Sequence, residues 1–174
     1  KHKIVNSLII KIKKLADITK SSLTSNIKID ISSKIPNTFV PGRNLLFYNL
    51  AASYAYTHNI DNIVSGVCQT DYSGYPDCRD VTIKTLNKAI NLGMEKKFKF
   101  HTPLMFLTKA QTWKLSYKIG GQKFINIIKN FTHTCYKGNR KKLFSWGYGC
   151  GKCPACIIRK KGWEEYNLEK KYEI

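Results

Sequence analysis

Four of the six cysteines fall in one stretch, and this stretch constrains the fold more than any other part of the sequence. Cys135 stands alone, and Cys150, Cys153 and Cys156 follow with two residues between successive cysteines. Thiolates at this spacing can reach one ion together, and Cys135 can complete a tetrahedron of four sulfur ligands. The intervening residues are rich in glycine and cannot build an apolar core of their own. The spacing therefore predicts a structural zinc site that holds this segment together.

Three other interpretations of the cysteines remain open. A C-x-x-C-x-x-C run also begins some iron–sulfur sites, although those of the ferredoxin type continue to a further cysteine followed by proline, and no cysteine follows Cys156. Disulfides would need an oxidising compartment, and the sequence shows no secretory signal, although its true start is expected upstream of Lys1. Buried, inert cysteines are the third alternative.

The composition favours a globular domain with a basic surface. The chain has 174 residues, 43% of them hydrophobic, and a formal net charge of +19. Only four of its 30 basic residues are arginine, and the lysines are spread along the whole length. Because phosphate and base recognition favours arginine in clustered patches, this pattern argues for a solvated lysine surface and against direct nucleic-acid binding. No apolar run reaches the roughly 18 residues of a membrane helix, so we expect no membrane association.

The order of the expected elements is that of a parallel α/β sheet. Apolar residues at helical spacing predict a helix over residues 44–58, buried on most sides, and a second helix over residues 81–92 that Gly93 ends. Strands are expected over residues 62–68 and 97–101. A further helix begins at the N-cap Thr108 and is interrupted at Gly120 and Gly121. Weaker patterns indicate a strand at 4–10, a helix at 12–18 and an extended segment at 27–31. The rhythm of strand, loop and helix predicts an α/β domain over residues 1–130, followed by the zinc-binding segment and a C-terminal helix over residues 131–174.

Two loops carry the side chains that could bind a substrate. The turn Pro41–Asn44 precedes the first long helix, whose free amides together with Arg43 could bind an anion; it could equally be an ordinary helix start. The second loop, residues 69–80, follows a strand at the end where open α/β sheets bind their ligands. Its polar side chains predict a substrate pocket, although a surface turn capped by Asp80 remains the alternative. These side chains are Asp71, Tyr72, Ser73, Tyr75, Asp77 and Arg79.

No arrangement of nucleophile and base is evident. The four histidines lack an arranged partner, and Cys68 or Cys78 could act as a nucleophile only if its thiolate were stabilised. The common phosphate-binding glycine motifs and H-E-x-x-H are absent from the sequence. The catalytic residues therefore stay unassigned.

Six segments nevertheless form a distinctive set. They are Phe39-Val-Pro-Gly-Arg-Asn44, Gly66-Val-Cys-Gln-Thr-Asp-Tyr-Ser-Gly-Tyr-Pro-Asp-Cys-Arg-Asp80, His101-Thr-Pro-Leu-Met105, Lys109-Ala-Gln-Thr-Trp113, Thr134-Cys-Tyr136 and Cys150-Gly-Lys-Cys-Pro-Ala-Cys156. Together they resemble the 7-cyano-7-deazaguanine synthase family of queuosine biosynthesis. The resemblance runs from the first residues to about Tyr166.

The resemblance implies a Rossmann-like fold of the PP-loop ATP pyrophosphatase group, with a parallel sheet that carries helices on both faces. It also implies a cytoplasmic homodimer, a structural Zn²⁺ on Cys135, Cys150, Cys153 and Cys156, and ATP, with Mg²⁺, as co-substrate. In this family ATP activates the carboxylate of 7-carboxy-7-deazaguanine, ammonia displaces AMP to give an amide, and a second activation dehydrates the amide to the nitrile. Deazapurine contacts are implied for the loop from Asp71 to Arg79. We add Arg43, Asn44 and Lys109 as candidate substrate-binding residues.

One departure from the family pattern concerns the nucleotide. The Ser-Gly-Gly-x-Asp-Ser turn that binds ATP in the family does not occur in these 174 residues, which begin near what should be the third strand. Backbone amides of such a turn hold pyrophosphate. We therefore expect the sequence to be an N-terminally truncated part of the synthase that does not complete the reaction alone. A basic zinc-containing RNA-binding module and an inactive remnant are the alternatives.

Overall fold

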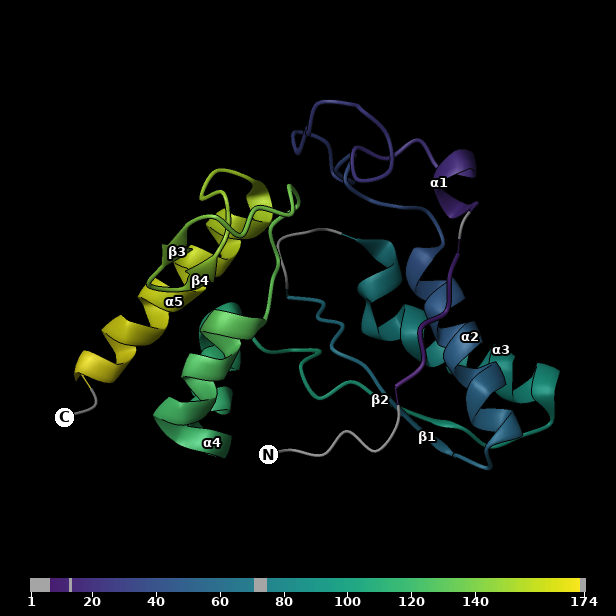
Figure 1. Cartoon of the computed structure of the whole chain (residues 1–174). Helices are drawn as coiled ribbons and strands as arrows, with labels where there is room; N and C mark the ends of the chain where they lie inside the picture. Colours follow the sequence, from purple (N-terminus) through teal and green to yellow (C-terminus); the bar gives the residue numbers. More distant parts are fainter. Residues whose placement is uncertain (1–6, 13, 71–74, 173–174) are drawn as a thin grey trace.

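The computed structural model describes residues 7–12, 14–70 and 75–172. Its elements form two groups (Figure 1). The first group, here called the α/β unit, comprises α2, β1, α3 and β2, and the second, the C-terminal unit, comprises α4, β3, β4 and α5. In chain order the elements are α1 (Leu15–Ile18), α2 (Arg43–Thr57), β1 (Asn62–Val64), the 3-10 helix η1 (Pro76–Cys78), α3 (Asp80–Met94), β2 (Lys99–His101), α4 (Lys109–Phe131), β3 (Leu143–Phe144), β4 (Gly147–Tyr148) and α5 (Pro154–Tyr172).

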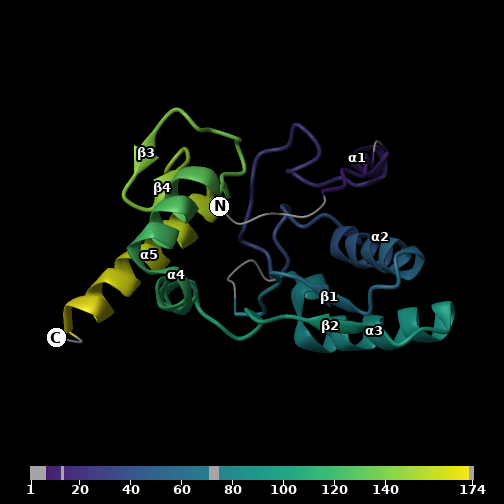
Figure 2. The same ribbon diagram turned by 60° about the horizontal axis from the view of Figure 1, so that its bottom comes forward.

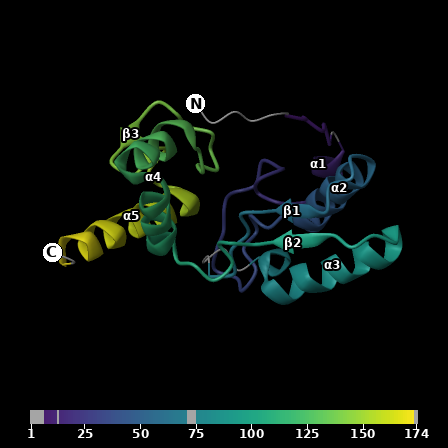
Figure 3. The same cartoon turned by 90° about the horizontal axis from the view of Figure 1, so that it is seen from below.

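A parallel pair of strands forms the centre of the α/β unit. β1 and β2 pair in parallel, with Ile63 opposite Phe100, and α3 makes the crossover between them. The two strands and the crossover helix lie side by side when the molecule is seen from below (Figure 3). The mixed α/β class and the parallel sheet that the sequence predicts are thereby confirmed, although each strand has three residues where a longer run was expected.

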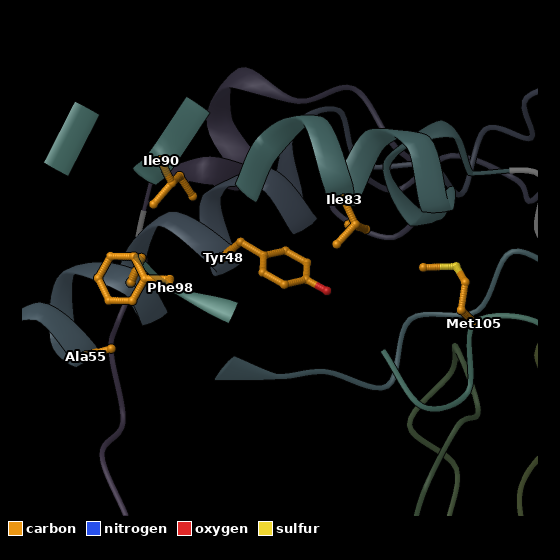
Figure 4. Close-up of a cluster of buried hydrophobic side chains, with 7 residues drawn as sticks. Tyr48, Ala55, Ile83, Ile90, Phe98 and Met105 are labelled. Carbon is orange, nitrogen blue, oxygen red and sulfur yellow. The ribbon is translucent and has the colours of Figure 1, made fainter. Parts of the chain in front are cut away.

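The core of this unit lies between the strands and the two long helices. Its buried members come from α2, from α3 and from the segments that flank β2: Tyr48, Ala52, Ala55, Ile83, Ile90, Phe98 and Met105 (Figure 4). The ring of Tyr48 stacks on Phe100 with 4.7 Å between centroids, which joins α2 to the sheet. Burying one such large apolar side chain stabilises a fold by roughly 1.5–3 kcal/mol.

Both helices cover the same face of the two strands. Ile63 and Phe100 pack against the core below α2 and α3, whereas Val64, whose side chain points the other way, is 68% exposed. Helices were expected on both faces, and among the described residues the second face carries none. For the same reason α2 is not buried on most sides: Phe47 is 48% and Tyr56 51% exposed, because only one stripe of the helix meets the sheet.

Helix α3 ends differently from the prediction. The sequence suggested that Gly93 ends this helix, but it continues to Met94, and Glu95 adopts the left-handed conformation with φ of 48°. The side chain of Asn91 fixes the exit, since it accepts a hydrogen bond from the Phe98 amide at 2.9 Å and donates one to the Phe98 carbonyl at 3.1 Å. These bonds replace the usual glycine cap.

The start and the kink of α4 agree with the sequence. Thr108 caps the helix through a reciprocal pair of hydrogen bonds with Gln111, at 3.1 Å and 2.8 Å. Gly120 and Gly121 leave the helical conformation, and Gly121 has φ of 58°, which favours glycine. The helix therefore consists of two segments that meet at this pair of glycines.

Helix α4 packs mainly against α5, with a smaller contact to β4, and not against the β1–β2 sheet (Figure 2). Trp113 and Trp163 meet edge to face at 4.8 Å, and Ile125 and Tyr166 are buried beside them. The close approach depends on Gly162, where a Cβ would lie 2.3 Å from that of Lys109. This packing places α4 beside the helix of the metal segment, and the expected domain boundary near residue 130 stays a prediction.

The segment before α2 has little regular structure. The expected strand at 4–10 lies partly outside the described residues, and residues 7–10 form no strand. The helix expected at 12–18 is reduced to α1, and residues 27–31 are coil. None of the helices in the described ranges is long and apolar enough to cross a bilayer.

Candidate metal centre and substrate cavity

The four cysteines of the C-terminal unit converge on one point. Cys135 lies in the loop after α4, Cys150 and Cys153 follow β4, and Cys156 lies in the first turn of α5. Their sulfur atoms all lie within 4.8 Å of one another, and those of Cys150 and Cys156 are 3.9 Å apart. Thiolates bound tetrahedrally to one ion at about 2.3 Å would be about 3.8 Å apart. The cluster could therefore hold one metal ion with a small contraction.

The backbone prepares one of these thiols to act as a ligand. The amides of Lys152 and Cys153 donate to Cys150 Sγ at 3.4 Å and 3.3 Å. Donation from the Lys152 amide, helped by that of Cys153, lowers the pKa of Cys150 to about 6. Burial has the opposite effect on Cys156 and raises its pKa to about 12. A dication among the four sulfurs would favour the thiolate at both positions.

Two glycines make room for the cluster. A Cβ at Gly149 would lie 2.6 Å from Cys156 Sγ and 2.9 Å from the Trp146 ring. Gly151 has φ of 74°, and a Cβ there would lie 2.9 Å from the ring of Phe144. A larger residue at either position would push the chain away from the sulfurs.

The geometry argues against two of the three alternatives left open by the sequence. All six cysteines are free, and sulfurs 3.9 Å apart are far from the roughly 2.05 Å of a disulfide bond. Convergence on one point also distinguishes the four from cysteines that are merely buried. Zinc and iron remain to be distinguished by chemistry.

Arg159 is a residue that the sequence reasoning missed. Its guanidinium is buried and donates to the carbonyl of Trp146 at 2.9 Å, to that of Ile128 at 3.1 Å and to Thr132 Oγ1 at 3.0 Å. Burial lowers the pKa of Arg159, and the neighbouring Cys156 acts against that shift. One side chain thus joins α5, the end of α4 and the hairpin formed by the antiparallel strands β3 and β4. The sequence signal that could have identified Arg159 is the rarity of arginine. In a lysine-rich chain an arginine indicates a position that needs the several hydrogen-bond donors of a guanidinium.

The turn before α2 is partly occupied by the chain itself. The backbone amide of Asn44 donates to Asp77 Oδ2 at 3.2 Å, and the Asn44 side chain donates to Cys78 Sγ at 3.1 Å. Asp77 is buried, so its carboxylate lies where a bound anion was expected. Gly42 opens the turn with φ of 73°.

The loop after β1 borders a cavity of about 460 Å³. Tyr75 is held in its wall, because its hydroxyl donates to Thr38 Oγ1 at 2.6 Å and its ring packs on Phe39 at 5.6 Å. The cavity lies at the carboxyl end of β1, as expected for a ligand site in an α/β sheet. Its lining comprises Leu23, Arg43, Gly66, Val67, Cys68, Tyr75, Cys78 and Tyr136.

The structure brings together some of the candidate substrate residues and separates others. Arg43, Asn44, Tyr75 and Asp77 gather at the cavity or beside it. Arg79 is exposed at the N-cap of α3, and Asp71, Tyr72 and Ser73 lie outside the described residues.

Lys109 borders a second cavity, of about 420 Å³, between α4 and α5. Trp113, Arg159 and Tyr136 are among the residues around it. The sequence marks Tyr136 only as part of the Thr134–Tyr136 motif.

Comparisons with known proteins match nearly the whole chain. The model of one family, described as queuosine biosynthesis protein QueC, matches residues 1–167. A relative from Nitrobacter hamburgensis, named 7-cyano-7-deazaguanine synthase, is 55% identical over 153 residues, which are 87% of this chain and 64% of the relative. Relatives of the same name from Bradyrhizobium sp. BTAi1 and Gluconobacter oxydans are 53% and 52% identical, with 64% and 63% of their length covered. The chain thus spans just under two thirds of the length of these relatives.

Proposed function

The chain belongs to the QueC family of queuosine biosynthesis proteins, and from this membership we propose that it works in 7-cyano-7-deazaguanine synthesis. The proposed reaction is an ATP-dependent ligation in which 7-carboxy-7-deazaguanine is adenylated on its carboxylate. Ammonia displaces AMP to form an amide. A second ATP, with Mg²⁺, then adenylates the amide oxygen, which leaves with AMP as the two N–H protons are lost and the nitrile forms. The names of the relatives support this assignment.

The observation that carries the proposal is the cavity at the carboxyl end of β1. Arg43 in its wall offers a guanidinium that can pair with a carboxylate through two parallel hydrogen bonds. The half-apolar lining around Val67 and Tyr75 suits a flat heterocycle. We propose that the deazapurine binds here with its carboxylate toward Arg43.

The remaining candidate residues receive different roles in this proposal. Because Asp77 is engaged with the amide of Asn44, we propose that these two residues position the loop and do not contact the substrate directly. The proposed deazapurine contacts still include four residues close in sequence to Tyr75, which lines the cavity: Asp71, Tyr72, Ser73 and Arg79. Lys109 borders the second cavity, where it could approach the acyl phosphate of the adenylate.

We propose that the four-cysteine cluster binds one structural zinc ion. Four protein ligands close the coordination sphere, so the metal would brace the C-terminal unit and take no part in the reaction. The compactness of the cluster favours one ion over a multi-iron cluster, whose thiolates stand further apart. Elemental analysis of the purified, folded protein should find about one zinc per chain. Iron in its place, or folded protein without metal, would refute the assignment.

Two further properties are proposed from the family alone. We propose that the protein is a homodimer in the cytoplasm. Light scattering coupled to size exclusion should give twice the chain mass of 20.0 kDa, and a monomer at micromolar concentration would contradict the dimer.

The test of the function uses binding, because it needs only the cavity. Calorimetric titration of the chain with 7-carboxy-7-deazaguanine should give saturable binding, and guanine, which lacks the carboxylate, should bind at least tenfold more weakly. Arg43→Met should abolish this preference, while Arg140→Met, an exposed arginine of the metal segment, should leave it unchanged. No binding of the deazapurine by the wild-type chain would contradict the proposal.

A second candidate function is favoured by one observation on charge. Between Glu95 and Glu164 the sequence contains no acidic residue, although it contains sixteen of the 30 basic ones. This stretch, most of which belongs to the C-terminal unit, is therefore uniformly positive, and the pattern suits a metal-containing module that binds RNA. Such a module would bind single-stranded RNA with an affinity that falls steeply as salt rises, and would ignore 7-carboxy-7-deazaguanine. Binding of 7-carboxy-7-deazaguanine together with no detectable binding of RNA would exclude the RNA-binding function.

A further inference from the structure

Tyr136 connects the metal centre to the α/β unit. It directly follows the candidate ligand Cys135, and its ring packs against the cysteine cluster. Its hydroxyl lies 3.4 Å from that of Tyr75, which donates in turn to Thr38 Oγ1 at 2.6 Å. Three hydroxyls from three distant parts of the chain therefore meet at one point between the two units.

Tyr136 also separates the two cavities described above. It borders both the cavity that contains Arg43 and the cavity that contains Lys109. No other described residue is shared between these two linings. A change in the position of this side chain would alter the shape of both cavities at once.

The Tyr136 hydroxyl can donate a hydrogen bond to a bound ligand. A phenol is protonated at neutral pH and offers one donor and its lone pairs. Tyr75 uses its own proton on Thr38, so it cannot donate to Tyr136 at the same time. The contact of 3.4 Å between the two tyrosines is long, and a ligand acceptor in either cavity would give the Tyr136 proton a shorter bond.

We infer that Tyr136 is a positioning residue for the heterocyclic substrate, and that the metal centre holds it in place. Its hydroxyl donates to an acceptor atom on the bound deazapurine, while the neighbouring ligand Cys135 fixes the backbone from which the side chain extends. Metal binding and substrate binding are then energetically coupled through one residue. The inference rests on the proposed function, because it takes the deazapurine as the ligand.

A thermodynamic cycle between the metal and this hydroxyl tests the inference. Titration of 7-carboxy-7-deazaguanine should give a Kd about 5- to 30-fold higher for Tyr136→Phe than for wild type, which is the loss of one hydrogen bond. The control, Tyr148→Phe, removes a hydroxyl from the same segment that borders neither cavity, and should change Kd less than twofold. Metal content should be equal in all three proteins.

The second part of the cycle measures the affinity for 7-carboxy-7-deazaguanine after a chelator has removed the metal under reducing conditions. Wild type should lose at least as much affinity as the substitution causes, and Tyr136→Phe should lose much less on metal removal than wild type does. Equal losses in the two proteins, or unchanged binding by metal-loaded Tyr136→Phe, would overturn the inference. If circular dichroism shows that the metal-free chain unfolds, the metal-loaded pair alone decides. Absence of binding by wild type would instead contradict the proposed function, and the inference with it.

Discussion

The α/β unit and the C-terminal unit are stabilised in different ways. The first has a continuous apolar core of seven buried residues contributed by helices and the segment around β2. In the second, the cluster around the hairpin consists of Trp146 and three of the four candidate metal ligands. The difference follows the composition, because a segment built from glycine, lysine and cysteine lacks the aliphatic side chains that pack the first unit. Where such side chains are scarce, four converging cysteines that could hold one metal ion and one buried guanidinium join the elements.

The largest expected effect comes from removing a metal ligand. Cys153→Ser should abolish metal binding, with a loss on the order of 10 kcal/mol of binding free energy, because structural zinc sites contribute about 10–16 kcal/mol. Amide hydrogen exchange should then accelerate throughout β3, β4 and the start of α5 but not in α2 and α3. Cys68→Ser, outside the cluster, should retain both metal and protection. Uniform acceleration in both units would show that they are not stabilised separately.

Replacing the buried guanidinium should have the next largest effect. Arg159→Met removes three hydrogen bonds from a buried charged group and takes the guanidinium donor from the Trp146 carbonyl, while the Ile128 carbonyl keeps its hydrogen bonds from Thr132. We expect a loss of about 3–5 kcal/mol in the free energy of unfolding. Arg159→Lys should recover little of it, since one ammonium group cannot reproduce the fork. Arg140→Met, at an exposed site, should cost less than about 1 kcal/mol. Urea denaturation measures all three, and a Lys variant as stable as wild type would contradict the role of the fork.

A cavity in the apolar core of the α/β unit should destabilise that unit and leave the metal centre unchanged. Ile83 is 3% exposed, so Ile83→Ala should lower the free energy of unfolding by about 2–5 kcal/mol. Val81→Ala, on the same helix but 66% exposed, should change it by less than about 0.5 kcal/mol. Metal affinity should be the same in both variants and in wild type. A tenfold loss of affinity in Ile83→Ala would mean that the core supports the metal centre.

The smallest effect concerns the junction of the two units. Thr108→Ala removes the side-chain acceptor of the capping box at the start of α4 and should cost about 1 kcal/mol. Thr85→Ala, at an exposed position within α3, should be neutral or slightly stabilising. Thermal denaturation should separate the two variants by a few degrees. Equal melting temperatures would indicate that the box contributes nothing in this context.

Local features of the fold could be predicted from the sequence, and long-range ones could not. Thr108 predicted the start of α4, and Gly120 with Gly121 its interruption, because in both cases the cause lies within a few neighbouring residues. The cysteine spacing predicted the cluster because four ligands of one residue type fall within a single short segment. The contact of Asp77 with the Asn44 amide joins residues 33 apart in the chain, and no periodic pattern in the sequence predicts it. The same holds for the position of Tyr136 between two cavities.

The burial of α2 shows a second limit of the sequence. Its apolar residues surround the helix, and the pattern therefore predicts burial on most sides. Hydropathy indicates which faces of a helix are more stable when buried. It does not indicate how many strands are present to bury them. The two described strands meet one stripe of the helix only, which leaves Phe47 and Tyr56 in contact with solvent.

The carboxylate of Asp77 anchors the end of the loop after β1 to the first turn of α2. It occupies the amide end of α2 and at the same time belongs to the short helix η1, two residues after Tyr75. A ligand phosphate or carboxylate that reaches this amide must displace it, and the net number of anions at the helix end stays the same. Binding of an anion at this amide would therefore exchange one acceptor of the same hydrogen bond for another.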